Sequence, residues 1–214
     1  MFPQVAFDRT VVTVNEDERV HTLVEFTAPE APGLERPDVD VVFVIDSSGS
    51  MEGRPLASVR EAVAEVLRHL GPGDRAGVVA FDSDSRIVLP LGRHIDPAAQ
   101  RTVLSIETGG STNLSAGWLM ASEMLRRDHR ERVVGRIVVL TDGHVNQGIV
   151  DEDALADMVS SSRRHGVTTS CIGFSDGFQE ELLGVLANAG GGNDYWCEGA
   201  DTAARVFRRE FDGL

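Results

Sequence analysis

The chain has 214 residues, of which 42% are hydrophobic and 25% charged, a composition typical of a globular protein large enough for one sizeable domain. Its formal net charge of -14 argues against binding to nucleic-acid phosphates, which requires a basic surface. Its 20 Lys and Arg residues are all arginine, which excludes Schiff-base, general-base and phosphate-loop lysines.

The N-terminal part of the sequence indicates a small β-rich segment. Apolar residues at alternate positions predict two strands within residues 3–28, with a polar turn over residues 15–19. Residues 29–38 are rich in proline, as linkers are. We therefore expect an N-terminal strand segment with its linker over residues 1–37 and a separate domain over residues 38–214. Strand edges left unpaired in the first segment would favour self-association.

The larger part of the chain alternates apolar strands with amphipathic helices. The predicted strands cover residues 39–46, 76–81, 85–91, 136–141, 167–174 and 193–198. The predicted helices cover residues 55–70, 96–107, 114–127, 151–166, 178–192 and 201–211. This alternation predicts an α/β fold, with a doubly wound, mostly parallel sheet and helices on both faces. The short turn before residue 85 makes strand 85–91 an antiparallel edge strand.

Two of the most apolar strands stop at aspartates, Asp46 and Asp142. Open parallel sheets bind ligands beyond the carboxyl ends of their strands, so both carboxylates are expected at the binding edge. Buried carboxylates that lie close together repel each other, and a divalent cation relieves that cost. Ser48, Ser50 and Thr112 add hydroxyl oxygens from neighbouring loops. An all-oxygen set favours Mg²⁺, with Mn²⁺ or Ca²⁺ as alternatives, over zinc.

Three segments that carry these residues resemble the metal-ion-dependent adhesion site (MIDAS) of von Willebrand factor type A (VWA) domains of the bacterial type. They are DSSGSM at residues 46–51, GGSTN at residues 109–113 and TDG at residues 141–143. Each segment alone is a weak signal, but three in this order after apolar strands are a strong one. The resemblance implies a Rossmann-like VWA fold over residues 38–214 with an intact MIDAS.

The resemblance also implies a role for each candidate residue. The hydroxyl groups that contact the ion are those of Ser48, Ser50 and Thr112. The carboxylates that act mainly through bound water are those of Asp46 and Asp142. One coordination position is left for an Asp or Glu carboxylate of a partner protein. The loops around the site are expected to form a partner-binding rim that consists of Met51, Glu52, His144, Val145 and Asn146.

The function expected from these features is metal-dependent protein–protein interaction, without enzymatic activity. A subunit or adaptor of a larger ATPase-driven or chaperone-like complex is an alternative that the sequence does not separate from it. A hydrolase or phosphatase is a further alternative, because haloacid-dehalogenase-type phosphatases place their nucleophile where Asp46 lies. Those enzymes need a second acid where this chain has Ser48, and a lysine, which it lacks. No GxSxG nucleophile elbow is present either.

Location is not specified by the sequence. No apolar run reaches the ~18 residues of a membrane span, and the N-terminus lacks the basic and apolar regions of a signal peptide. These features favour the cytoplasm and leave the compartment open. Cys171 and Cys197 have no CxxC spacing, so we expect buried free thiols. The end of the sequence shortly after the last predicted helix suggests a fragment or a minimal form.

Overall fold

The computed structural model describes residues 4–7, 21–25, 37–94, 96–174, 179–197, 202 and 205–206. The chain divides into two compact units, Met1–Arg36 and Pro37–Leu214. Among the described residues, no helix has the length and apolar character needed to cross a membrane.

The N-terminal unit contains two short strands, β1 (Gln4–Phe7) and β2 (Thr22–Glu25), which pair antiparallel. Every residue of both strands is exposed, including Phe7. A two-stranded sheet of this kind is marginally stable on its own. The turn predicted over residues 15–19 and most of the predicted linker lie outside the described residues.

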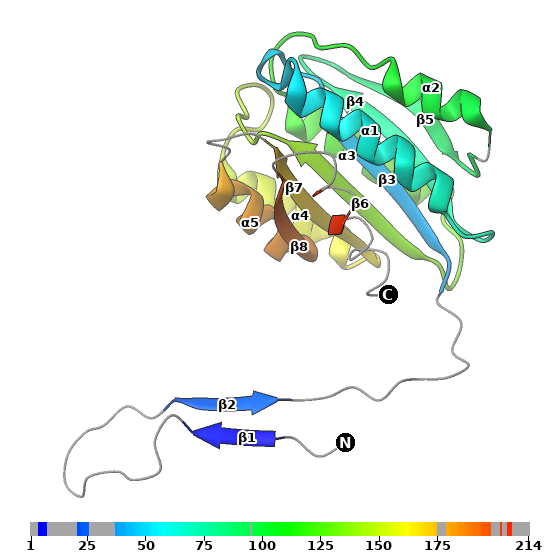
Figure 1. The fold of residues 1–214 in the computed structure, drawn as a ribbon. Helices are drawn as coiled ribbons and strands as arrows, with labels where there is room; N and C mark the ends of the chain where they lie inside the picture. The colour runs from blue at the N-terminus through cyan, green and yellow to red at the C-terminus, as the bar shows by residue number, and fades with distance from the viewer. Residues whose placement is uncertain are drawn as a thin grey trace, which may run out of the picture. The chain divides into compact units, whose positions relative to one another are not determined.

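The second unit is built on a six-stranded sheet with the strand order β5-β4-β3-β6-β7-β8 (Figure 1). Its strands are β3 (Val39–Asp46), β4 (Arg75–Phe81), β5 (Ser85–Gly92), β6 (Val134–Thr141), β7 (Val167–Phe174) and β8 (Gly191–Cys197). All neighbours pair in parallel except β4 and β5, which are antiparallel. The predicted α/β fold with an antiparallel edge strand is therefore confirmed.

Helices cover both faces of this sheet. They are α1 (Arg54–His69), α2 (Pro97–Leu104), α3 (Leu114–Arg127), α4 (Glu152–Arg163) and α5 (Glu180–Gly190), and a 3₁₀ turn, η1 (Gly49–Met51), precedes α1. Alternate residues of β3 point to opposite faces, as in any strand. Val41 and Phe43 pack with α1 and α2, whereas Val42 and Val44 pack with α3, α4 and α5. The sheet is thus buried on both sides, which explains its continuous apolar strands.

Local polar side chains fix where several of these helices begin. Asp96, Asn113 and Asp151 are N-cap residues whose side chains accept backbone N–H groups of the first turn. The cap at Asn113 has a functional consequence, because it sets the start of α3 directly after Thr112. The helix predicted over residues 201–211 lies mostly outside the described residues.

Candidate metal centre

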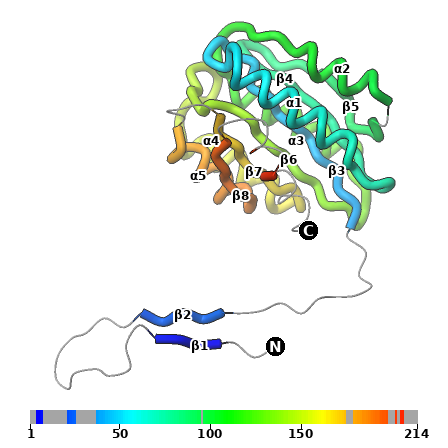
Figure 2. Tube along the Cα trace, viewed as in Figure 1, coloured from blue at the N-terminus to red at the C-terminus, as the bar shows by residue number. Residues whose placement is uncertain are grey.

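The two central strands define a binding edge. From β3 the chain adds β4 and β5 on one side of the sheet, and then β6, β7 and β8 on the other. The order therefore reverses between β3 and β6, which lie side by side in the middle of the sheet (Figure 2). Asp46 is the last residue of β3, and Asp142 directly follows β6. Both predicted carboxylates therefore lie at the topological switch point, where open α/β sheets bind their ligands.

Asp46 is a fully buried carboxylate whose hydrogen-bond partners are all uncharged. Its Oδ1 accepts the backbone N–H of Ser48 at 2.8 Å, and its Oδ2 accepts the hydroxyl of Thr141 at 2.5 Å. Burial raises the pKa of Asp46 to about 6, and the charge of Asp142 acts in the same direction. The hydrogen bonds from Ser48 and Thr141 oppose this shift in pKa without cancelling it. Among the described residues, no cationic side chain contacts this buried carboxylate.

The predicted hydroxyl ligands of the first loop lie together. The Oγ atoms of Ser48 and Ser50 are 3.2 Å apart, with Ser48 buried and Ser50 exposed. Two backbone hydrogen bonds tie this loop to the next one: Gly109 N–H donates to Ser47 C=O at 2.6 Å, and Gly49 N–H to Gly110 C=O at 3.2 Å. The loop before Thr112 is thereby held against the Ser48–Ser50 segment.

Thr112 is positioned by the loop that follows β6. Its backbone N–H donates to Asn146 Oδ1 at 2.8 Å, and its carbonyl accepts the N–H groups of Asn146 and Gln147, both at 3.2 Å. Within the described part of the chain, the Thr112 hydroxyl makes no hydrogen bond, so this oxygen remains available to a ligand.

Asp142 is held in a sharp turn. Its Oδ1 accepts the backbone N–H of His144 at 3.1 Å, and its carbonyl accepts the N–H of Gln179 at 3.2 Å. The next residue, Gly143, has a φ of 78°, a conformation that favours glycine. A Cβ there would also lie 3.2 Å from the backbone nitrogen of Gln179. Glycine is therefore required at this position of the TDG segment.

The predicted rim needs one correction. Met51 is not a rim residue: the η1 turn folds it into the core cluster beneath α1, where its side chain is fully buried. Asn146 is exposed, and its Oδ1 also accepts the backbone N–H of Thr112, so it connects the predicted rim to a candidate ligand. Glu52 and His144 are exposed as expected, and Val145 is partly buried against the α3 side of the core.

Thr141 is a site residue that the sequence interpretation did not single out. Its hydroxyl donates to Asp46 and accepts the N–H of Gly143 at 2.9 Å, so it links the ends of β3 and β6. A polar residue at the end of the apolar run in β6 was the available signal. Its partner lies 95 residues away in the chain, and only the folded sheet reveals the contact.

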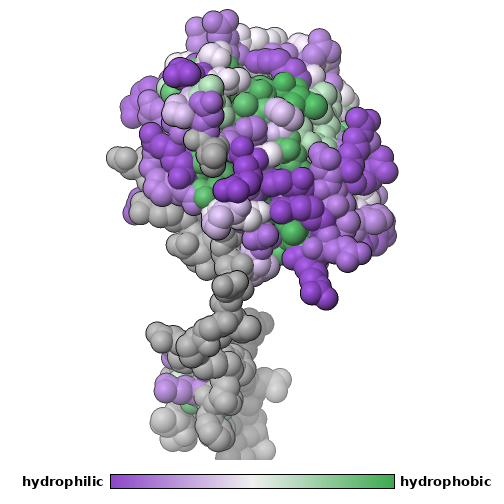
Figure 3. Space-filling model, turned by 90° about the vertical axis from the view of Figure 1, so that its right-hand side faces the viewer, coloured by the Kyte–Doolittle hydropathy of each residue, from purple (hydrophilic) through white to green (hydrophobic). Residues whose placement is uncertain are grey.

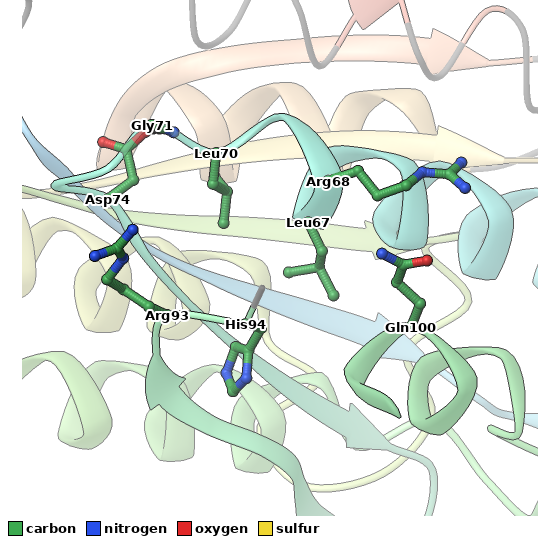
Figure 4. A pocket seen from close by; sticks show the side chains of 8 residues that line it. All are labelled: Leu67, Arg68, Leu70, Gly71, Asp74, Arg93, His94 and Gln100. Atoms are coloured by element: carbon green, nitrogen blue, oxygen red, sulfur yellow. Dashed lines mark hydrogen bonds between the residues drawn. The ribbon is translucent and has the colours of Figure 1, made fainter. Parts of the chain in front are cut away.

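The opposite end of the sheet contains a hollow that is lined by charged and apolar side chains and is separate from the candidate metal centre (Figure 4). It has a volume of about 170 Å³ and is lined by Arg68, Asp74 and Arg93 among others. The Asp74 carboxylate accepts backbone N–H groups, from Val39 at 3.0 Å and from Gly71 at 2.8 Å. Asp74 therefore has a structural role in the loop between α1 and β4.

The donor set at the binding edge fits a hard divalent cation. It consists of two carboxylates and three hydroxyls, and the residues that the structure describes contain no group of three or more His, Cys, Asp or Glu side chains suited to a metal. Zinc-finger sites bind their metal through thiolate and imidazole ligands, so this set of oxygen ligands differs from them. A divalent cation takes six or more oxygen ligands, so a set of five side chains leaves a coordination position for water or a further oxygen.

Fold and site together define a doubly wound α/β domain with carboxylates and hydroxyls gathered at its switch point. Residues 40–205 match the family model of the von Willebrand factor type A domain, and the chain belongs to this family. The family is known for protein–protein interaction and adhesion, and its members commonly bind a divalent cation at the MIDAS.

Several known proteins are similar to this chain. The uncharacterized protein YfbK of Escherichia coli K12 is 29% identical over 91% of the chain, which spans 34% of that relative's length. BatB of Bacteroides thetaiotaomicron has the same fold, with a TM-score of 0.71 and 18% identity over 82% of this chain and 98% of its own. Proximal thread matrix protein 1 of the mussel byssus, solved with zinc in its MIDAS motif, has a TM-score of 0.65 and 21% identity over 82% of this chain and 45% of its own.

Proposed function

We propose that this chain is a metal-dependent protein-binding module. In this proposal Asp46, Ser48, Ser50, Thr112 and Asp142 hold a divalent cation, with Mg²⁺ preferred. The observation that carries the proposal is the environment of Asp46, a fully buried carboxylate at the switch point whose donors among the described residues are all uncharged. A buried charge without a counter-charge is costly, and a bound cation offsets that cost.

The partner in this proposal supplies a carboxylate. Two carboxylates and three hydroxyls leave a divalent ion able to attract a further anionic oxygen. The exposed rim residues Glu52 and His144 and the partly buried Val145 lie beside the loops that hold the ion. The zinc-occupied MIDAS of the mussel protein supports the idea that this fold places a metal here. The bound ion would serve as a bridge between two proteins, and we propose no catalytic step.

Calorimetric titration of Mg²⁺, Mn²⁺ and Ca²⁺ into the chelator-treated full chain tests the proposal. We expect saturable binding of one ion per chain to the native protein. Thr112→Val keeps the shape of the side chain and removes the hydroxyl, so it should weaken binding by about tenfold or more, the loss of about one good ligand interaction.

Thr102→Val is the matched control, because the Thr102 hydroxyl bonds only to the carbonyl of Ala98 at 3.0 Å, in α2. This variant should bind the ion like the native protein. If the native protein has an intact fold by circular dichroism and binds none of the three ions, the proposed function is wrong.

A further inference from the structure

An apolar groove runs between the edge strand β5 and helix α3. It has a volume of about 560 Å³, and its apolar lining comes mainly from Ile87, Pro90, Leu91, Leu119, Met120 and Met124. Ile87 and Leu119 are 53% and 50% exposed. Figure 3 shows apolar residues gathered on the side of the second unit that carries the β5 edge. Large apolar side chains concentrated along a concave surface are typical of interaction sites.

The groove begins directly beneath the candidate metal centre. Its lining includes Ser85 and Ala116, the metal-side ends of its two walls. Ala116 N–H bonds to the Asn113 side chain, next to the candidate ligand Thr112. Ser85 follows a turn in which the hydroxyl of Ser83 accepts the N–H of Ser111 at 2.9 Å. The groove is therefore continuous with the proposed partner-binding surface.

The walls of the groove suit an extended peptide. β5 is an outer strand of the described six-stranded sheet, so one side of its backbone has no strand partner within that sheet. Such an edge can pair with an added strand over Ser85–Leu89, before Pro90 removes a donor. On the helix side, Glu123 is paired with Arg126 and Arg127. The Glu123 charge is thus paired on the helix itself, Asp128 lies at the far end of the groove, and the floor between them is apolar.

We infer that the partner segment whose carboxylate binds the metal continues as an extended chain along this groove. This inference rests on the proposed function and adds a second recognition element to it. Leu119 and Met124 lie five positions apart on α3, or about 8 Å along the helix axis, which equals about two residues of extended chain. Thr112 precedes this helix, so the candidate metal centre lies beyond the Leu119 end of the groove. The recognised sequence therefore has an Asp or Glu on the metal side of two large apolar residues that are about two positions apart.

Selection from a random peptide library on the full chain in Mg²⁺ tests this inference. We expect the enriched peptides to share that spacing of one acidic and two apolar residues. The double variant Ile87→Ser, Leu119→Ser should weaken their binding about tenfold or more, as loss of buried apolar anchors does. Its Mg²⁺ titration should match that of the native protein. Leu104→Ser is the control, because Leu104 is 45% exposed on α2, outside the groove.

The possible results separate this inference from the proposed function. Peptides that need Mg²⁺ but bind the double variant equally well would overturn the groove and leave the metal-dependent function standing. Peptides that need the groove but ignore chelator and Thr112→Val would overturn the coupling of the two elements. No enrichment would overturn the inference as well. A dimer in sedimentation that the double variant abolishes would assign the groove to a second copy of the chain instead.

Discussion

The two ends of strand β3 each carry a buried aspartate, and their surroundings differ completely. Asp40, near the start of the strand, lies between two arginines: Arg75 donates from Nε at 2.9 Å and from Nη2 at 2.6 Å, and Arg130 donates to both carboxylate oxygens as well. Burial by itself would raise the pKa of Asp40, but the hydrogen bonds and charges of Arg75 and Arg130 outweigh burial and lower it. Asp46, at the other end, receives only uncharged donors, and its pKa is raised to about 6.

This difference separates a carboxylate with a structural role from one in the candidate metal centre. At Asp40 the chain supplies its own counter-charge and thereby joins β3, β4 and the segment after α3. At Asp46 the described residues supply no such counter-charge, and in the proposed function a bound cation supplies it. A buried carboxylate therefore indicates function when its protein partners leave its charge uncompensated.

The largest expected effect is the loss of the Asp40 cluster. Asp40→Ala leaves two partly buried guanidinium groups without their shared partner, which should lower the free energy of unfolding by about 3 kcal/mol or more. Urea unfolding of the native protein and the variant measures this loss. A change below about 1 kcal/mol, the range of surface ion pairs, would contradict the structural role of Asp40.

The second largest expected effect is an increase in the free energy of unfolding when a metal binds at the other end of β3. Mg²⁺ at a hundredfold excess over its Kd should raise the free energy of unfolding by about 2.7 kcal/mol through preferential binding to the folded state. Asp46→Asn should abolish this increase, whereas Asp40→Asn should retain it in whatever fraction of the variant still folds. Thermal unfolding with Mg²⁺ and with chelator measures both. Equal stabilisation of the native protein and Asp46→Asn would place the ion elsewhere.

Asp46 and Asp40 should also make the free energy of unfolding depend on pH in opposite directions. The pKa of Asp46 rises from 3.8 to about 6 on folding, so the metal-free folded protein holds a proton that the unfolded chain has already released. The free energy of unfolding should then fall by about 2 kcal/mol between pH 4 and pH 7, at 1.36 kcal/mol per unit of pKa shift. Subtracting the profile of Asp46→Asn in chelator isolates this contribution, and a flat difference would refute it.

Asp40 should act in the opposite direction. Because its pKa is lowered on folding, its contribution to stability is complete above the ordinary aspartate pKa of 3.8 and is lost as the pH falls through the lowered value. The difference between the native protein and Asp40→Asn should therefore shrink only under strong acid. A difference that shrinks between pH 5 and pH 7 would contradict this assignment.

The smallest effect on stability is expected when an exposed ion pair is removed. Glu123 contacts Arg126 and Arg127 on the solvent side of α3, where water screens the charges. Glu123→Gln should leave the melting temperature within experimental error. A large loss at Glu123 would undermine the distinction between buried and exposed carboxylates on which the other predictions depend.

The sequence alone was sufficient for the fold and for the edge of the sheet at which the candidate residues lie. The apolar runs of β3 and β6 predict buried parallel strands, and the polar residues that follow them lie at the binding edge. The rim was less predictable. Met51 follows Ser50 directly, yet the η1 turn directs its side chain into the core, and neighbouring positions in a tight turn face opposite ways.

What the sequence by itself determined was therefore local: strand and helix periodicity, helix caps, and the ends of strands where polar groups gather. Only the tertiary structure decided which distant groups meet, as with Arg130 and Asp40, 90 positions apart, or Thr141 and Asp46, 95 positions apart. The physical reason is that periodicity reports which face of an element is buried, whereas charge compensation depends on which elements become neighbours. The contrast between Asp40 and Asp46 exists only once the sheet has formed.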